Sequence, residues 1–175
     1  MYTNVSALFG PVCDFAMAPI ARQANYWKLP VLTTGAMAAE FGTHKKDIYS
    51  YLTRVGPNLN SFSTFLLDLI VNHFHWRKVK LVYQPKGQHY IVDKFCHLIT
   101  EALHNHFNEN DIIHDYYKIM EMDQFYDQMP HELGNFAIIL LCVNNGSLRD
   151  IMIEAAKLNF NNGEYVFFNA NLFDG

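Results

Sequence analysis

A cysteine at the turn between a predicted strand and a predicted helix is the first residue whose position suggests chemistry. The apolar residues before it end at Gly10-Pro11, and Cys13 follows almost at once. A thiolate at a helix N-terminus is stabilised by the helix dipole, but a nucleophile also needs a base within reach. The sequence places no such base, so catalysis, metal ligation, a disulfide and simple burial all stay open for Cys13.

The histidines are the second group that could do chemistry, because imidazole is a common metal ligand. They include His73-Phe74-His75 and His104-Asn105-His106, and in a helix residues two apart point to different faces. His97, Glu101 and His104 instead share one helical face, but they do not form the HExxH zinc pattern. We expect a polar helix face that meets a ligand, with a zinc site as the alternative, and predict no metal.

The start of the first predicted helix also offers two backbone amides, those of Val12 and Cys13. Phosphate-binding loops need several glycines between strand and helix, whereas this turn has Gly10 alone and Pro11 lacks an amide donor. The two amides can hold one small anion, and the alternative is that an N-cap or water satisfies them.

Composition and charge exclude several classes of protein. The 175 residues are 50% apolar and 17% charged, which suffices to bury a core, and their net charge is -4. Lys and Arg form no phosphate-neutralising cluster, so we expect no nucleic-acid partner. The longest apolar run, Phe136–Val143, is too short to cross a bilayer, and residues Met1–Ser6 lack a signal-peptide pattern.

Apolar runs and helical spacing alternate along the chain. We expect strands at Val5–Phe9, Pro30–Thr33, Tyr51–Val55, Val79–Tyr83, Ile112–Ile119, Phe136–Val143 and Tyr165–Asn169. We expect helices at Cys13–Trp27, Asn58–Phe74, Ile91–Phe107, Gln124–Met129 and Leu148–Leu158. Proline disfavours helix interiors, so a kink or restart is predicted at Pro19 and a helix end before Pro130.

This order of elements predicts an α/β fold with parallel sheets flanked by helices. Ligands in such folds bind outside the carboxyl ends of the strands. The turn Val55-Gly56-Pro57 predicts a boundary between a first lobe, 1–57, and a second lobe, 58–175. Because both ends of the chain lie next to predicted strands, we expect an excerpt of a longer protein.

Two tripeptides match the acceptor pattern for N-linked glycans, Asn4-Val5-Ser6 and Asn145-Gly146-Ser147. Such a pattern has meaning only in a secreted chain. For Asn145, we expect instead that the side chain caps the helix that follows.

Several segments resemble the extracellular domain of natriuretic peptide receptors, most closely the clearance-receptor branch. They are "CDFAMAPIARQANYWKLPVLTTGAMAAEF", "YLTRVGPNLN", "HFHWRKVKLVY", "RDIMIEAAK" and "GEYVFFNANLF", which together run through nearly the whole chain in order. The resemblance implies a type I periplasmic-binding-protein-like fold, in which two lobes surround a cleft, and it implies that this chain is a fragment of the full domain.

The same resemblance implies roles for the cysteines and for the Gly-Pro-Val-Cys turn. It pairs Cys96 with Cys142 in a disulfide, and it gives Cys13 a partner upstream of this chain. It also implies a chloride site built from the backbone amides of Val12 and Cys13. No other cofactor is expected.

Peptide contacts carry over from the family position by position. The matching residues are Phe15, Arg22, Tyr49, Tyr83, His97, Glu101, His114 and Tyr117. Phe15 stands where the family has a tyrosine, and His97-Leu98 stands where one branch has two phenylalanines. Strand alternation places Tyr117 on the face of Asp115 and not on that of Tyr116.

The resemblance implies a peptide-hormone-binding region of a single-pass membrane receptor, on the outer side of the plasma membrane and working as a homodimer. It would serve signalling or hormone clearance and not catalysis; a guanylate cyclase domain, if the parent has one, would lie outside this chain. The alternative is a small-molecule sensor of the same fold, which needs convergent hydroxyls such as those of Thr33-Thr34.

Overall fold

The computed structural model describes residues 5–171, so the tripeptide acceptor at Asn4 lies outside the described residues. The chain divides into two compact units, one up to Phe65 and one from Leu66 onward, and each is described by itself. The division falls inside helix α3 (Leu59–Leu67). The lobe boundary expected after residue 57 stays a prediction.

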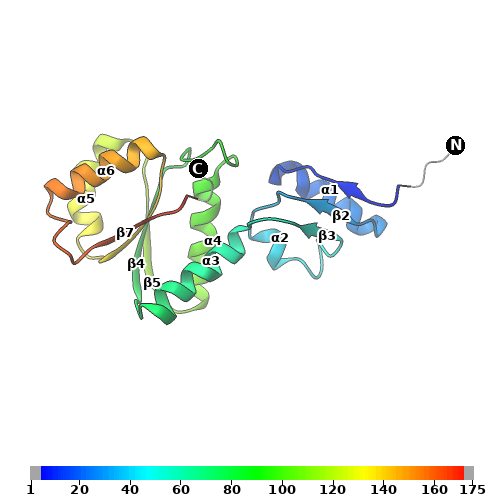
Figure 1. The fold of residues 1–175 in the computed structure, drawn as a ribbon, viewed down its shortest axis with the longest axis horizontal. Helices are drawn as coiled ribbons and strands as arrows, with labels where there is room; N and C mark the ends of the chain where they lie inside the picture. Colours follow the sequence, from blue (N-terminus) through cyan, green and yellow to red (C-terminus); the bar gives the residue numbers. More distant parts are fainter. Residues whose placement is uncertain (1–4, 172–175) are drawn as a thin grey trace. The chain divides into compact units, whose positions relative to one another are not determined.

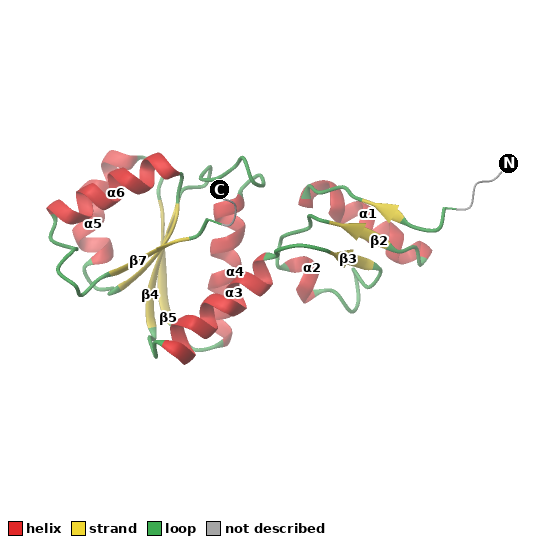
Figure 2. Ribbon diagram, in the orientation of Figure 1, coloured by secondary structure: helices red, strands yellow, loops and turns green. Residues whose placement is uncertain are grey.

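The first unit is a small parallel sheet covered by a helix (Figures 1 and 2). Its strands are β1 (Leu8–Phe9), β2 (Val31–Thr33) and β3 (Leu52–Arg54), in the order β1-β2-β3. Helix α1 (Asp14–Trp27) buries Met17, Ala21 and Ala24 against Val31 and Leu52. A short helix, α2 (Glu40–Thr43), occurs in the segment between β2 and β3 where only a loop was expected.

Helix α1 runs through Pro19 without the predicted restart. A proline removes the hydrogen bond to the carbonyl four residues earlier, here that of Phe15. Phe15 is exposed, so water can satisfy this carbonyl. Burial of Met17, Ala21 and Ala24 on one face favours one continuous helix on both sides of the proline.

The second unit is a larger parallel sheet with helices on both faces (Figure 1). Its strands are β4 (Lys78–Tyr83), β5 (Ile113–Lys118), β6 (Ile138–Cys142) and β7 (Val166–Asn169), in the order β5-β4-β6-β7. Helix α4 (Phe95–Glu109) packs on β4 and β5 from one face. Helices α5 (Met122–Leu133) and α6 (Asn145–Lys157) cover the other face. Two parallel sheets flanked by helices confirm the predicted fold class.

Three helices of this part of the chain differ from the sequence prediction. The segment predicted as one helix over 58–74 is α3 followed by a π-helix, η1 (Asp68–His73), and α4 begins at Phe95 instead of Ile91. Helix α5 continues through Pro130 to Leu133, so the predicted end before this proline is wrong. Met129 and Leu133 are fully buried, and this tertiary burial outweighs the local cost of the proline.

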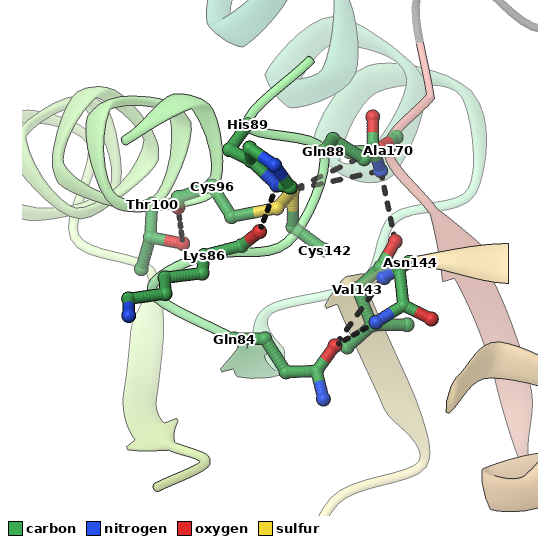
Figure 3. Close-up of a disulfide and its surroundings, with 10 residues drawn as sticks. All are labelled: Gln84, Lys86, Gln88, His89, Cys96, Thr100, Cys142, Val143, Asn144 and Ala170. Carbon is green, nitrogen blue, oxygen red and sulfur yellow. Dashed lines mark hydrogen bonds between the residues drawn. A yellow bond between two sulfur atoms is a disulfide. The ribbon is translucent and has the colours of Figure 1, made fainter. Parts of the chain in front are cut away.

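A disulfide joins Cys96, in the first turn of α4, to Cys142 at the end of β6 (Figure 3). Beside it, the Gln88 side-chain amide donates to the carbonyls of Val143 at 3.1 Å and Ala170 at 2.7 Å. A Cβ at Gly87 would lie 3.0 Å from the Cys96 sulfur, so glycine lets the loop pass this close to the disulfide. The loop after β4 is therefore tied to the carboxyl ends of β6 and β7.

Replacing both disulfide cysteines, Cys96→Ser with Cys142→Ser, is expected to lower the free energy of unfolding substantially. The bridge spans 46 residues, and a loop of this length corresponds to about 4 kcal/mol in the chain-entropy model. Denaturant unfolding followed by circular dichroism measures the loss. The exposed Cys13→Ser serves as the control and should change stability by much less. Equal stability of the double variant and the wild type would contradict a structural role for the bridge.

Candidate functional site

The described part of the second unit contains a pocket of about 170 Å³ between α4 and the strands β4 and β5. Its lining residues are Tyr83, His97, Thr100, Glu101, His104 and Tyr116. Tyr83 is the last residue of β4, and Tyr116 lies on the adjacent strand. His97, Glu101 and His104 come from successive turns of α4, because residues three and four apart share a helix face.

The polar groups of this pocket are suited to hold a ligand. The rings of Tyr83 and His97 lie with centroids 6.1 Å apart. Burial raises the pKa of the Tyr83 hydroxyl above its ordinary value of 10.0, and the neighbouring Tyr116 and Glu101 raise it further. Tyr83 therefore keeps its proton at neutral pH and can donate a hydrogen bond. Tyr116 and Glu101 are exposed and accessible to a partner.

A hydrogen bond between His104 and His114 joins α4 to β5 at the edge of the pocket. His114 Nδ1 lies 2.8 Å from the carbonyl of Ile112, and His114 Nε2 lies 2.8 Å from His104 Nδ1. A carbonyl only accepts, so Nδ1 of His114 donates to it, and the hydrogen bond between His114 Nε2 and His104 Nδ1 joins the two rings. Asn108 completes the chain at 3.1 Å from His104 Nε2. His114 thus positions its neighbour Tyr116 without itself lining the pocket.

The zinc alternative finds no support in the geometry. Across residues 5–171, no three His, Cys, Asp or Glu side chains come close enough together to hold a metal ion. His97 and Glu101 line the pocket beside His104, but His104 is engaged with His114.

Tyr117 lies on the opposite face of the sheet from this pocket. Its ring packs on Phe125 of α5 at 5.2 Å, and its hydroxyl donates to Gln128 Oε1 at 2.6 Å. The buried Lys80 on the same face pairs with Asp115 at 2.5 Å and with Glu132 at 2.6 Å. The predicted alternation is confirmed, because Tyr117 shares the face of Asp115 while Tyr116 faces α4.

Of the carried-over contact residues in this unit, the structure brings Tyr83, His97 and Glu101 together and places His114 beside them. It does not bring Tyr117 to them. Tyr116 was missed as a lining residue, and the period of two along β5 was the signal that could have found it.

The first unit holds the remaining carried-over residues. Phe15 is 91% exposed, and Arg22, seven residues further along α1, is also exposed. The Arg22 guanidinium lies 5.8 Å from the centroid of the Tyr49 ring. Tyr49 itself is buried and packs on Phe41 at 4.8 Å. Phe15 and Arg22 are thus accessible, whereas Tyr49 is buried and its ring lies beneath the Arg22 guanidinium.

The Gly-Pro-Val-Cys turn is held by the segment after β2. Thr33 Oγ1 donates to the Pro11 carbonyl at 2.7 Å, and the amide of Ala36 donates to the Val12 carbonyl at 3.3 Å. Cys13 is the N-cap of α1, and within residues 5–171 its side chain makes no capping bond and no disulfide. The upstream partner expected for Cys13 stays a prediction.

A second cavity, of about 320 Å³, lies at the carboxyl ends of β4, β5 and β6. It is lined by Gln84, Pro85, Lys86, Gly87, Ile119, Met120 and Asn144. Asn144 caps α6, since its side chain accepts from the Ser147 amide at 2.8 Å. The expectation that Asn145 is the cap is therefore wrong by one residue, because the extended backbone needed at an N-cap occurs at Asn144.

Parallel α/β units, with hollows at the carboxyl edge and along α4, define the class of this chain as a ligand-binding region of the periplasmic-binding-protein type. The model of the family described as "Receptor family ligand binding region" matches residues 1–173. The chain belongs to this family, and the resemblance to natriuretic peptide receptors is confirmed.

Curated relatives share this region. Atrial natriuretic peptide receptor 3 of Homo sapiens is 33% identical over 170 residues, which are 95% of this chain and 30% of that receptor. Receptor 3 of Mus musculus is also 33% identical over 172 residues, and it too is covered over 30% of its length. Atrial natriuretic peptide receptor 2 of Homo sapiens is 30% identical over 99% of this chain, which spans 16% of that protein. Among the described helices, none has the length and apolar character to span a membrane.

The ion pairs of Lys80 predict a specific pH dependence of stability. Burial alone would raise the pKa of Asp115, but the hydrogen bond and charge of Lys80 outweigh it and hold this pKa below its ordinary value of 3.8. A lowered folded-state pKa stabilises the protein above the ordinary pKa and ceases to do so as the pH falls through the folded value.

We therefore expect Asp115→Asn to lower the free energy of unfolding at neutral pH. Below pH 3.8, the free energy of unfolding of this variant should fall less steeply with pH than that of the wild type. Urea unfolding at a series of pH values measures both effects. Glu109→Gln, at the exposed end of α4, is the matched control. Identical pH profiles for wild type and Asp115→Asn would contradict the Lys80 interaction.

Proposed function

We propose that this chain is the peptide-hormone-binding region of a membrane receptor, and that it lies outside the cell. The observation that carries the proposal is the convergence of Tyr83, His97 and Glu101 with Tyr116 in one pocket. The named relatives are natriuretic peptide receptors, so a natriuretic-type peptide is the ligand that we propose. A membrane anchor would lie outside these residues.

The chemistry of the pocket suits a peptide better than a small polar metabolite. Tyrosine offers a large apolar ring and one hydroxyl, and such residues often dominate the energy of peptide and protein interfaces. Glu101 can pair with a basic side chain, and the Tyr83 hydroxyl can donate to a peptide carbonyl. In the first unit, Phe15 and Arg22 present an accessible ring and a cation.

The receptor is proposed to act as a homodimer whose protomers share the peptide. Binding would shift the relative orientation of the protomers through contacts that differ between the two states. The proposed role consists of binding, so no residue of this chain has to make or break a bond. The small-molecule alternative is not favoured, because the relatives are peptide receptors.

Substitutions on the two faces of β5 test the proposed site. Tyr116→Ala should weaken the binding of a labelled natriuretic-type peptide to the full receptor by roughly 10-fold or more, since it removes an exposed aromatic contact. Arg22→Ala should weaken binding in the same direction. Tyr117→Leu should leave affinity unchanged and lower stability only, because the Tyr117 ring packs on α5.

Saturation binding on cells gives the affinities, and surface expression of each variant provides the control for folding. Unchanged affinity of Tyr116→Ala together with weakened binding of Tyr117→Leu would overturn the assignment to the α4 face.

We also propose that a chloride ion binds to the amides of Val12 and Cys13. The position of the two amides supports this, because they lie just before the first turn of α1, where the helix dipole favours an anion. The Asp14 carboxylate is turned away, since it accepts from the amides of Met37 at 2.8 Å and Ala38 at 2.9 Å.

Crystals of the full extracellular region grown in bromide should show an anomalous peak within hydrogen-bond distance of the Val12 and Cys13 amides. A halide at this place would order the turn that precedes Phe15. Crystals grown in acetate without halide are the control, and a featureless anomalous map in bromide would count against the site.

A further inference from the structure

We propose that Asn145 carries an N-linked glycan, and that this glycan covers the cavity at the carboxyl edge of the second sheet. The proposal rests on the proposed extracellular function. Asn145-Gly146-Ser147 satisfies the acceptor pattern, with no proline at its second position.

The structure assigns the capping role to Asn144 and not to Asn145. Asn144 caps α6, and Asn145 is the first residue of the helix. Asn145 and Gly146 are both exposed. Side chains in a helix tilt towards its N-terminus, so the Asn145 side chain is directed towards the carboxyl edge of the sheet. The exposed backbone and side chain at this position are accessible to the transferring enzyme.

The disulfide points to the compartment in which such glycans are added. Cys96 and Cys142 are both buried in the second unit, and their bridge requires an oxidising compartment. In the transfer, the amide nitrogen of Asn145 bonds to the anomeric carbon of a lipid-pyrophosphate-linked oligosaccharide. The bond from this carbon to the pyrophosphate oxygen breaks. The lipid pyrophosphate leaves with the electron pair, and the amide loses one proton.

The neighbours of Asn145 determine what the glycan would cover. Asn144 lines the cavity of about 320 Å³ together with Gln84, Lys86 and Met120. A bulky, hydrated glycan on the next residue stands at the rim of this cavity. Helix α6 packs on the face of the sheet opposite to α4, so the pocket of Tyr83 and Tyr116 remains open. The glycan would therefore block a small-molecule site at the edge and spare the proposed peptide site.

Variants of the full receptor, expressed in animal cells, test the modification. Asn145→Gln and Ser147→Ala destroy the acceptor pattern, whereas Ser147→Thr retains it and is the matched control. Mass spectrometry after enzymatic deglycosylation in heavy-oxygen water should find residue 145 converted to labelled aspartate in the wild type and in Ser147→Thr. The two disrupted variants should show no conversion and run as a smaller protein by one glycan.

The same peptide maps separate this proposal from the proposed function. An unmodified Asn145 in surface-exposed receptor with an intact Cys96–Cys142 bridge would overturn the glycan and leave the receptor role standing. Free thiols at both cysteines would overturn the extracellular location and the glycan together.

Shielding of the cavity can be tested at two exposed positions near the ends of β5. Met120 lies at the carboxyl edge and Ile113 at the opposite edge, and both are exposed. A bulky maleimide should label Met120→Cys several-fold faster in the Asn145→Gln background than in the wild-type background. Ile113→Cys should react at the same rate in both. Equal rates at Met120→Cys in a receptor with a proven glycan would overturn the shielding.

Discussion

The disulfide between Cys96 and Cys142 is the constraint on which the second unit depends. It attaches the first turn of α4 to the end of β6, the strand next to β4 in the sheet. His97, Glu101 and His104 follow Cys96 on the same helix, so their positions relative to Tyr83 are set where this bridge holds α4. Gln88 reinforces the same corner through its bonds to the carbonyls after β6 and β7. The bridge holds α4 against the sheet at this corner, so a hollow for a ligand can form beside it.

The two faces of the sheet at β4 and β5 are stabilised by different interactions. On one face, the buried charge of Lys80 is matched by Asp115 and Glu132, which is needed because an unpaired buried charge is strongly destabilising. On the other face, the linked rings of His104 and His114 join strand to helix and leave Tyr116 accessible. Adjacent residues of β5 thus have opposite roles. This explains why Tyr117, although it matches a contact position in the family, packs on α5.

Two of the hollows in the described part of the second unit differ in the ligands that they suit. The pocket along α4 is lined by aromatic and ionisable side chains, which favour a peptide, whereas the cavity at the carboxyl edge is the usual place for a small ligand in this class of fold. A glycan at Asn145 would make the second place inaccessible. The proposed peptide site and the proposed glycan therefore occupy different parts of the second unit.

The sequence by itself determined the alternation of strands and helices, the parallel α/β class and the family, because apolar periodicity and motif residues are local properties. It also placed Tyr117 on the face of Asp115, since strand alternation has a period of two. The passage of α1 through Pro19 and of α5 through Pro130 was decided by tertiary burial, which outweighs local helix propensity. Only the tertiary structure showed that Asn144 and not Asn145 caps α6, and that Tyr116 joins Tyr83 and Glu101. The cap is a local bond to Ser147 whose register depends on the extended backbone at Asn144. The meeting of Tyr116 with Tyr83 and Glu101 depends on contacts between residues far apart in the chain, and such contacts exist only once the sheet and its helices have packed.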